Sequence, residues 1–177
     1  HRLVDPVYEA GTSPSQDQEI LGHLEAVPQH PGNGMYVFDP NSHRRGPFDD
    51  TSSPHTDLYS PFHRESALCG TCHDVSNPVF VRDGTNVEYV ANAFDQAPAI
   101  DSPYELMPVE RTYSEWYHSA YNSSNGVYAP QFAGNKAGGM VASCQDCHMP
   151  DILGHGADTN QYPSAPLRPD LPLHDMT

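Results

Sequence analysis

The sequence predicts a mainly irregular fold with short α-helices and one small β-hairpin, organised as a single region over residues 1–177. Three observations lead to this prediction. The chain contains 18 prolines and 13 glycines, its apolar fraction is only 37%, and its four cysteines all fall within two five-residue motifs. Proline and glycine interrupt regular elements, and a low apolar fraction indicates a thin side-chain core. The fold therefore needs a source of stability besides its core, and the cysteine motifs are the obvious one.

The first half of the chain predicts few regular elements. Residues 1–13 have the composition of a loop, and residues 15–24 predict a short helix that begins after a serine cap. Residues 27–62 are rich in Pro, Gly, Asn, Asp and Ser and predict irregular structure, with one short strand at 35–38. Residues 62–69 contain good helix formers and no helix breaker, so we expect a short helix that leads into the first cysteine motif.

The second half contains the only clear sheet signal. Residues 78–90 form two β-rich runs on either side of an Asp-Gly pair, which predicts a β-hairpin. Residues 105–121 predict a helix with an aromatic stripe at helical spacing, which would pack in the core or against a cofactor. Residues 122–139 predict a surface loop, and the proline-rich tail from Pro150 is expected to be extended.

Both cysteine motifs have the form C-x-x-C-H, which is the attachment signal for a c-type haem. Two thiols three positions apart can form thioethers with the two vinyl groups of one porphyrin, and the next imidazole then becomes the proximal iron ligand. The expected thioether anchors are Cys69, Cys72, Cys144 and Cys147, and the expected proximal ligands are His73 and His148. The sequence thus predicts two haem c groups and leaves no cysteine over.

Three other interpretations of the motifs compete with haem. A four-cysteine zinc ribbon places its C-x-x-C pairs ~15–20 residues apart, whereas 71 residues separate Cys72 from Cys144. A thioredoxin-like redox motif belongs in a βαβ pattern, which the sequence does not indicate. Two disulfides of a secreted domain remain open but leave the histidine after each pair unexplained.

The sixth position of each iron is the next question, because it is either filled by a second side chain or left open for a substrate. The chain has 11 histidines, so nine remain after the two proximal ones. Ranked by sequence context, the candidates for distal ligation are His63, His55, His118 and His174. His63 lies six residues before Cys69, which is too near for that haem but suitable for a neighbouring one. Met149 directly follows His148 and is not expected to be a ligand.

At these motifs the chain resembles multihaem c-type cytochromes of the tetrahaem and octahaem group. The resemblance depends on Cys69–Asp74 and Cys144–Pro150, and it covers most of residues 40–150. Weaker support comes from three linking segments, Arg45–Phe48, Ser60–His63 and Tyr113–Trp116. The resemblance implies a haem-wrapped multihaem architecture, closely spaced haems with mostly bis-histidine ligation, and electron transfer along them.

Both termini fit the ends of a fragment of a longer cytochrome. His1-Arg2 resembles the end of an upstream haem motif whose cysteines precede the sequence, which would add a further haem near His1. The alternative role for His1 is that of a distal ligand. The segment at His174 resembles a distal-ligand region that continues further.

The charge of the chain limits its partners. The formal net charge is −15, with 8 Lys and Arg against 23 Asp and Glu, which argues against nucleic acid. Redox partner proteins with a basic surface, or neighbouring haem subunits in an oligomer, are the expected partners. No stretch approaches the ~20 apolar residues of a membrane span. Attachment of haem c implies export, so the expected location is periplasmic or extracellular.

Electron transfer through the haems is therefore the first functional hypothesis. The second is a haem enzyme in which one open iron reduces or oxidises a small nitrogen or sulfur compound. Neither motif departs from C-x-x-C-H, and the single lysine, Lys136, lies outside both, so the sequence favours an electron carrier over an enzyme. The third hypothesis is a subunit of an extracellular multihaem assembly.

Overall fold

The structure is a computed structural model that describes residues 1–84, 88–97 and 102–174. Within these residues the chain forms short helices and many very short strands. The helices are α1 (Ser15–Gly22), α2 (Ser66–Gly70), α3 (Thr112–Tyr117) and α4 (Cys144–His148), with 3₁₀ turns η1 (Pro61–Arg64) and η2 (Ala137–Gly139). The strands are β1 (Leu3–Val4), β2 (Val37–Phe38), β3 (Arg44–Gly46), β4 (Asp57–Tyr59), β5 (Val75–Arg82), β6 (Tyr89–Ala91), β7 (Leu106–Glu110), β8 (Val127–Tyr128), β9 (Met140–Val141), β10 (Asp151–His155) and β11 (Leu167–Pro172).

The predicted fold class is wrong. In the described residues the strands form five separate sheets, with the orders β1-β2, β3-β4, β6-β5-β7, β8-β9 and β10-β11. The described part of the chain is therefore a small mixed fold of short helices and several small sheets. It does not show the predicted haem-wrapped cytochrome architecture. The error has a physical reason, since strands of two or three residues are too short to carry an alternating hydrophobic pattern.

Three local predictions are confirmed. Helix α1 occupies most of the expected 15–24 segment, and β2 occupies the second half of the expected 35–38 strand. Strands β5 and β6 form the expected antiparallel hairpin, in which Arg82 pairs with Tyr89. Part of the connection between these strands, residues 85–87, lies outside the described residues.

The helix predicted over 105–121 is correct only in its second half. Residues 106–110 form β7, which pairs with β5, and only α3 is helical. Strand β7 is an edge strand in the order β6-β5-β7, so Pro108 is tolerated there although it lacks an amide hydrogen. The tail from Pro150 contains extended segments, as predicted, and these are paired, because β10 and β11 run antiparallel.

The helix predicted over 62–69 is interrupted. The 3₁₀ turn η1 ends at Arg64, Glu65 is extended with φ −98° and ψ 141°, and α2 then begins at Ser66. This break changes the direction of the chain immediately before the first cysteine motif. Phe62 and His63 are the buried residues of η1.

Among the described residues, six of the nine buried apolar side chains form two small, separate clusters. One contains Val4, Ile20 and Val37, and the other contains Ala129, Ala133 and Val141 with Cys147 packed against it.

A buried ionic cluster supplements the first of these cores. The Arg45 guanidinium donates to Asp17 Oδ1 at 2.6 and 2.9 Å and to Asp39 Oδ2 at 2.7 Å, and all three side chains are fully buried. Breaking such a cluster would leave an uncompensated buried charge.

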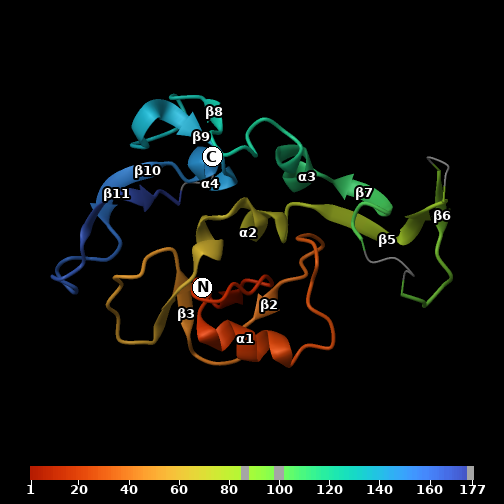
Figure 1. Ribbon diagram of the computed structural model, residues 1–177, viewed down its shortest axis with the longest axis horizontal. Helices are drawn as coiled ribbons and strands as arrows, with labels where there is room; N and C mark the ends of the chain where they lie inside the picture. The colour runs from red at the N-terminus through yellow and green to blue at the C-terminus, as the bar shows by residue number, and fades with distance from the viewer. Residues whose placement is uncertain (85–87, 98–101, 175–177) are drawn as a thin grey trace.

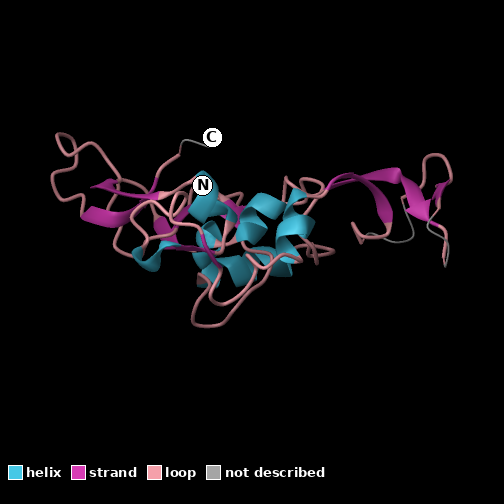
Figure 2. Cartoon of the chain, turned by 90° about the horizontal axis from the view of Figure 1, so that it is seen from above, coloured by secondary structure: helices cyan, strands magenta, loops and turns pink. Residues whose placement is uncertain are grey.

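Helix α2 lies at the centre of the molecule (Figure 1). On one side of it are α1, β1, β2 and β3, and on the other side are α4 and the strands β8 to β11. The β5-β6-β7 sheet extends from this body as an arm, which the second view also shows (Figure 2). The first cysteine motif, which begins in α2, therefore lies where the two halves of the chain meet.

Candidate cofactor site

The second motif forms helix α4, and its local sequence explains why a five-residue helix holds there. The Ser143 hydroxyl accepts a hydrogen bond from the Asp146 amide at 3.1 Å, and the Asp146 carboxylate accepts from the Ser143 amide at 3.0 Å. This reciprocal capping box satisfies donors at the helix start. Lys136 Nζ also donates to Asp146 Oδ2, at 2.6 Å. The helix is thus fixed from its N-terminal end.

The two motif helices are in direct contact. The Cys144 amide donates to Ser66 Oγ at 3.0 Å, and Gln145 Nε2 donates to the Glu65 carbonyl at 2.7 Å. Both contacts join the start of α4 to the start of α2. They bring together two motifs that the sequence places far apart.

The first cysteines of the two motifs lie near this contact, close enough for each thiol to shift the pKa of the other. The neighbouring Cys144, together with burial, raises the pKa of Cys69. Cys69 in turn lowers the pKa of Cys144, although burial opposes the effect, and Ser66 and His148 add to it. Cys144 is consequently the more reactive thiol of the pair.

The other motif residues are more exposed, with one exception. Cys72, His73 and His148 are exposed, and all four cysteines are free thiols. Cys147 is half-buried and packs against Ala129, Ala133 and Val141. Each motif therefore offers an imidazole at the surface, and the first motif also offers an exposed thiol there.

A buried polar network supports the first motif from behind. The Tyr113 amide donates to the His73 carbonyl at 2.8 Å, and the Ser114 hydroxyl donates to Asp74 Oδ2. Asp74 is fully buried, and Arg111 Nη1 lies 3.3 Å from its Oδ1. The Arg111 guanidinium also donates to Ser76 Oγ and to three backbone carbonyls. Sequence reasoning missed this network, because no local pattern indicates a partner for Arg111 thirty-seven residues away.

Gly70 lets helix α3 pack against the first motif. A Cβ atom at this position would lie 2.5 Å from the Tyr113 ring, which is closer than carbon atoms can approach. Tyr113 is buried, and its ring packs against Trp116 and Tyr117 at centroid distances of 5.4 and 6.1 Å. The predicted aromatic stripe is thus real, and its buried member contacts the motif helix.

Among the predicted distal ligands, His63 has the most distinctive environment. Only 8% of the residue is exposed, and neither ring nitrogen has a hydrogen-bond partner. Burial lowers the pKa of His63 to about 4, so the ring is neutral at physiological pH. The ring of His1 lies beside it, with 5.5 Å between the centroids. A buried neutral imidazole with two unsatisfied nitrogens is suited to a ligand that protein groups do not supply.

The remaining predicted ligands lie at the surface. His55 is exposed, and its Nδ1 lies 2.9 Å from both Ser53 Oγ and Asp57 Oδ1. His118 and His174 are also exposed, and His118 packs edge-on against Tyr117. The structure therefore brings His1 and His63 together but keeps the other three as surface side chains.

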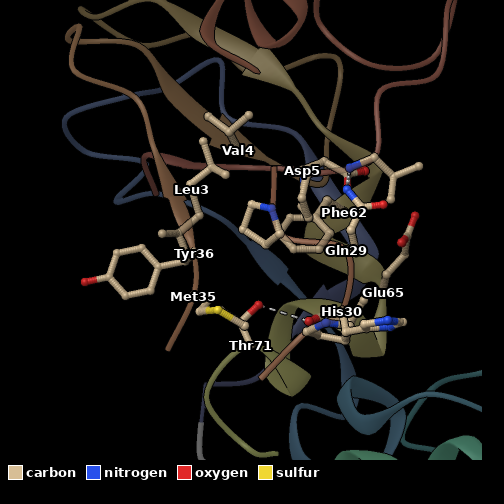
Figure 3. Close-up of a pocket in the computed structure, with 16 residues that line it drawn as sticks. Leu3, Val4, Asp5, Gln29, His30, Met35, Tyr36, Phe62, Glu65 and Thr71 are labelled. Carbon is tan, nitrogen blue, oxygen red and sulfur yellow. Dashed lines mark hydrogen bonds between the residues drawn. The ribbon is translucent and has the colours of Figure 1, made fainter. Parts of the chain in front are cut away.

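A small apolar pocket lies beside the first motif (Figure 3). His30, Met35, Phe62 and Thr71 are among the residues that line it, and its volume is about 80 Å³. This volume is far below the ~300–1,000 Å³ of small-molecule sites. His30 was not singled out by sequence reasoning, since its Pro-rich surroundings carry no ligand signal, and it is exposed.

Within the described residues, no three His, Cys, Asp or Glu side chains gather closely enough to hold a metal ion on their own. No helix of the described part of the chain has the length and apolar character needed to cross a membrane.

Comparison of the sequence and structure with family models, curated proteins and solved structures found no match.

Proposed function

We propose that the chain carries two covalently bound c-type haems, one at Cys69–His73 and one at Cys144–His148, and that it transfers electrons through them. The observation that carries the proposal is the direct contact between two complete C-x-x-C-H motifs that use all four cysteines of the chain. When bound, haem c supplies an iron centre that accepts and donates one electron at a time. Two such centres on contacting helices suit transfer between them.

The residues of the chain have distinct roles in this proposal. The four cysteines anchor the cofactors, and His73 and His148 are the proximal ligands. The hydrogen bond from the Tyr113 amide to the His73 carbonyl holds the backbone of His73 in place. The interaction of Arg111 with Asp74 fixes the residue that follows the first motif. The capping box of Ser143 and Asp146 does the same for the second motif. Rigid placement matters because the ligand geometry tunes the iron.

His63 and His1 are proposed as the residues that would hold a further iron, that of the third haem expected near His1. Both ring nitrogens of His63 lack a hydrogen-bond partner, and the His1 ring lies beside it with 5.5 Å between the centroids. Imidazole nitrogens are ordinary ligands of haem iron, so this pair would suit such an iron. His63→Ala should then convert one low-spin haem signal to high spin, whereas His155→Ala, at an exposed histidine, should not.

The partners follow from the charge. With a formal net charge of −15, the surface attracts basic redox proteins, and contact with neighbouring haem subunits is the alternative. A periplasmic or extracellular location is proposed with them, because haem c is attached after export. Association with a basic partner should weaken as ionic strength rises.

Haem attachment is tested by producing the full chain in a host that exports it and attaches haem c. Intact mass and a haem stain on a denaturing gel should show one haem for each motif. Cys69→Ser with Cys72→Ser, and Cys144→Ser with Cys147→Ser, should each remove one haem, while His30→Ala should remove none. A protein of unmodified mass that still folds would overturn the proposal.

A haem enzyme is the second candidate, and one observation favours it. Of the four distal candidates ranked above, only His63 is buried and unpartnered, so a motif iron without a second histidine would remain open to a small nitrogen or sulfur compound. Optical spectra with and without carbon monoxide separate the two functions. Spectra that do not respond support the electron carrier, and a fraction that binds carbon monoxide supports the enzyme.

A further inference from the structure

The contact between α2 and α4 pairs two particular thiols out of the four. Cys69 lies three positions after Ser66 in α2, on the same face of the helix, and the Cys144 amide donates to Ser66 Oγ at 3.0 Å, so the two cysteines are neighbours. The hydrogen bond from Gln145 to the Glu65 carbonyl also holds the helices together there. The other two thiols have different surroundings. Cys72 is exposed, and Cys147 packs against the cluster of Ala129, Ala133 and Val141.

Sequence separation does not explain this pairing. Cys69 and Cys144 are 75 positions apart, and so are Cys72 and Cys147, whereas the two cysteines of each motif are 3 positions apart. In an unfolded chain, the cost of loop closure would favour bridges within a motif by roughly a hundredfold over any bridge between the motifs. It would also make the four possible bridges between the motifs about equally frequent, because their separations are 72 to 78 positions. Only the folded contact favours Cys69 with Cys144.

We propose that in the haem-free chain Cys69 and Cys144 form a disulfide between the motifs, which blocks haem attachment at both of them until it is reduced. This inference rests on the proposed function, since it describes how loading of the same site is controlled. Each haem needs both thiols of its motif, so one bridge between the first thiols disables two attachment sites at once.

The chemistry requires an oxidant, which a small disulfide such as oxidised glutathione supplies. The Cys144 thiolate attacks one sulfur of that disulfide, forms a mixed disulfide and releases one thiolate of the reagent. Cys69 then loses its proton to the released thiolate and attacks the Cys144 sulfur, which expels the second thiolate. Two electrons pass from the protein to the reagent, one sulfur–sulfur bond breaks and one forms.

Two matched variants of the full haem-free chain test the proposal. Cys72→Ser with Cys147→Ser leaves only the pair in contact, and Cys69→Ser with Cys144→Ser leaves a pair with the same separation of 75 positions. Both are equilibrated with mixtures of reduced and oxidised glutathione, alkylated and weighed by mass spectrometry. The effective thiol concentration should be at least about tenfold higher for the first variant than for the second.

The unmodified chain gives an independent readout. Peptide mapping without reduction should recover a cross-link between residues 69 and 144. Equal effective concentrations in the two variants would overturn the proposal, and so would a map with bridges only inside the motifs, because both outcomes mean that the contact does not direct oxidation.

Haem attachment under reducing conditions separates this inference from the proposed function. Attachment without any 69–144 bridge would leave the proposed function intact and remove the switch. A 69–144 bridge in a chain that never binds haem, even when reduced, would mean that the bridge has no loading to control and would overturn both.

Discussion

At position 70 the structure accepts only glycine, because the Tyr113 ring occupies the space where a side chain would begin. Gly70→Ala should lower the free energy of unfolding by about 1–3 kcal/mol, since the ring or the helix has to move. Gly22 is the matched control, because it is also helical and nothing lies within 4 Å of a Cβ atom built there. Gly22→Ala should be neutral or stabilising by up to about 1 kcal/mol. Urea unfolding of both variants measures the difference, and equal effects would contradict the steric argument.

Arg111 is the second residue on which the first motif depends. Arg111→Met would remove the cation beside the fully buried Asp74 and leave the Ser76 hydroxyl and three carbonyls without this donor. We expect a loss of about 3 kcal/mol in the free energy of unfolding. Arg64→Met removes an ion pair with Asp170 in which both side chains are 43% exposed, so it should cost below about 1 kcal/mol. Denaturant midpoints compare them, and similar losses would show that the Arg111 network is not structural.

The C-x-x-C-H motifs and His63 could be singled out from the sequence, because the pattern and a histidine close to it are local signals. The role of His63 as a ligand stays a prediction. The supporting residues were not. Arg111 and Asp74 interact across 37 positions, and Ser66 accepts from an amide 78 positions away. Such partners are set by how the elements pack, which leaves no pattern along the chain.

At the scale of elements, α4 depends on the charge of Asp146. Burial tends to raise the pKa of this carboxyl, but hydrogen bonds from Lys136 and from the Ala142 and Ser143 amides outweigh it and lower the pKa below 3.8. The unfolded chain therefore takes up this proton first as the pH falls. The stability that Asp146 contributes is present above about pH 4 and is lost as the pH falls through the folded-state value.

Asp146→Asn should consequently destabilise the protein at pH 7 and reduce the stability lost between pH 5 and pH 3, both measured by urea midpoints. Asp49→Asn, at an exposed carboxylate, should change neither quantity appreciably. A larger loss on acidification in the Asp146 variant than in the parent chain would contradict the sign of the effect.

Elements with local signals were predicted, and elements made by distant pairing were not. The β5–β6 hairpin and helix α1 follow from a turn signal and a helix pattern close by in sequence. Strand β1 exists because Val4 pairs with Val37, and the parallel pair β3–β4 joins Arg45 to Leu58. In the 105–121 segment the local pattern was misleading. Its residues favour a helix, but pairing with β5 makes a strand of the first part.

At the scale of the whole molecule, the described part of the chain has two small apolar clusters on either side of the motif helices and a sheet that extends away from them (Figures 1 and 2). Bound haems would add apolar surface where the side chains supply little. The haem-loaded chain should therefore melt roughly 10 °C or more above the haem-free chain, which corresponds to about 3 kcal/mol at this length. Scanning calorimetry of both forms measures the shift. Equal melting temperatures would mean that haem contributes nothing to folding.

Because the two motifs are synthesised one after the other, the contact between α2 and α4 can form only after the second motif has been made. Cys69 leaves the ribosome 75 residues before Cys144, which at synthesis rates of about 5–20 residues per second is a delay of roughly 4–15 s. During that interval the first motif is complete while its helix partner does not yet exist. Attachment that begins on the exported part of the chain before synthesis ends would therefore meet an unhindered first motif, whereas attachment to the finished chain would meet two motifs already held together.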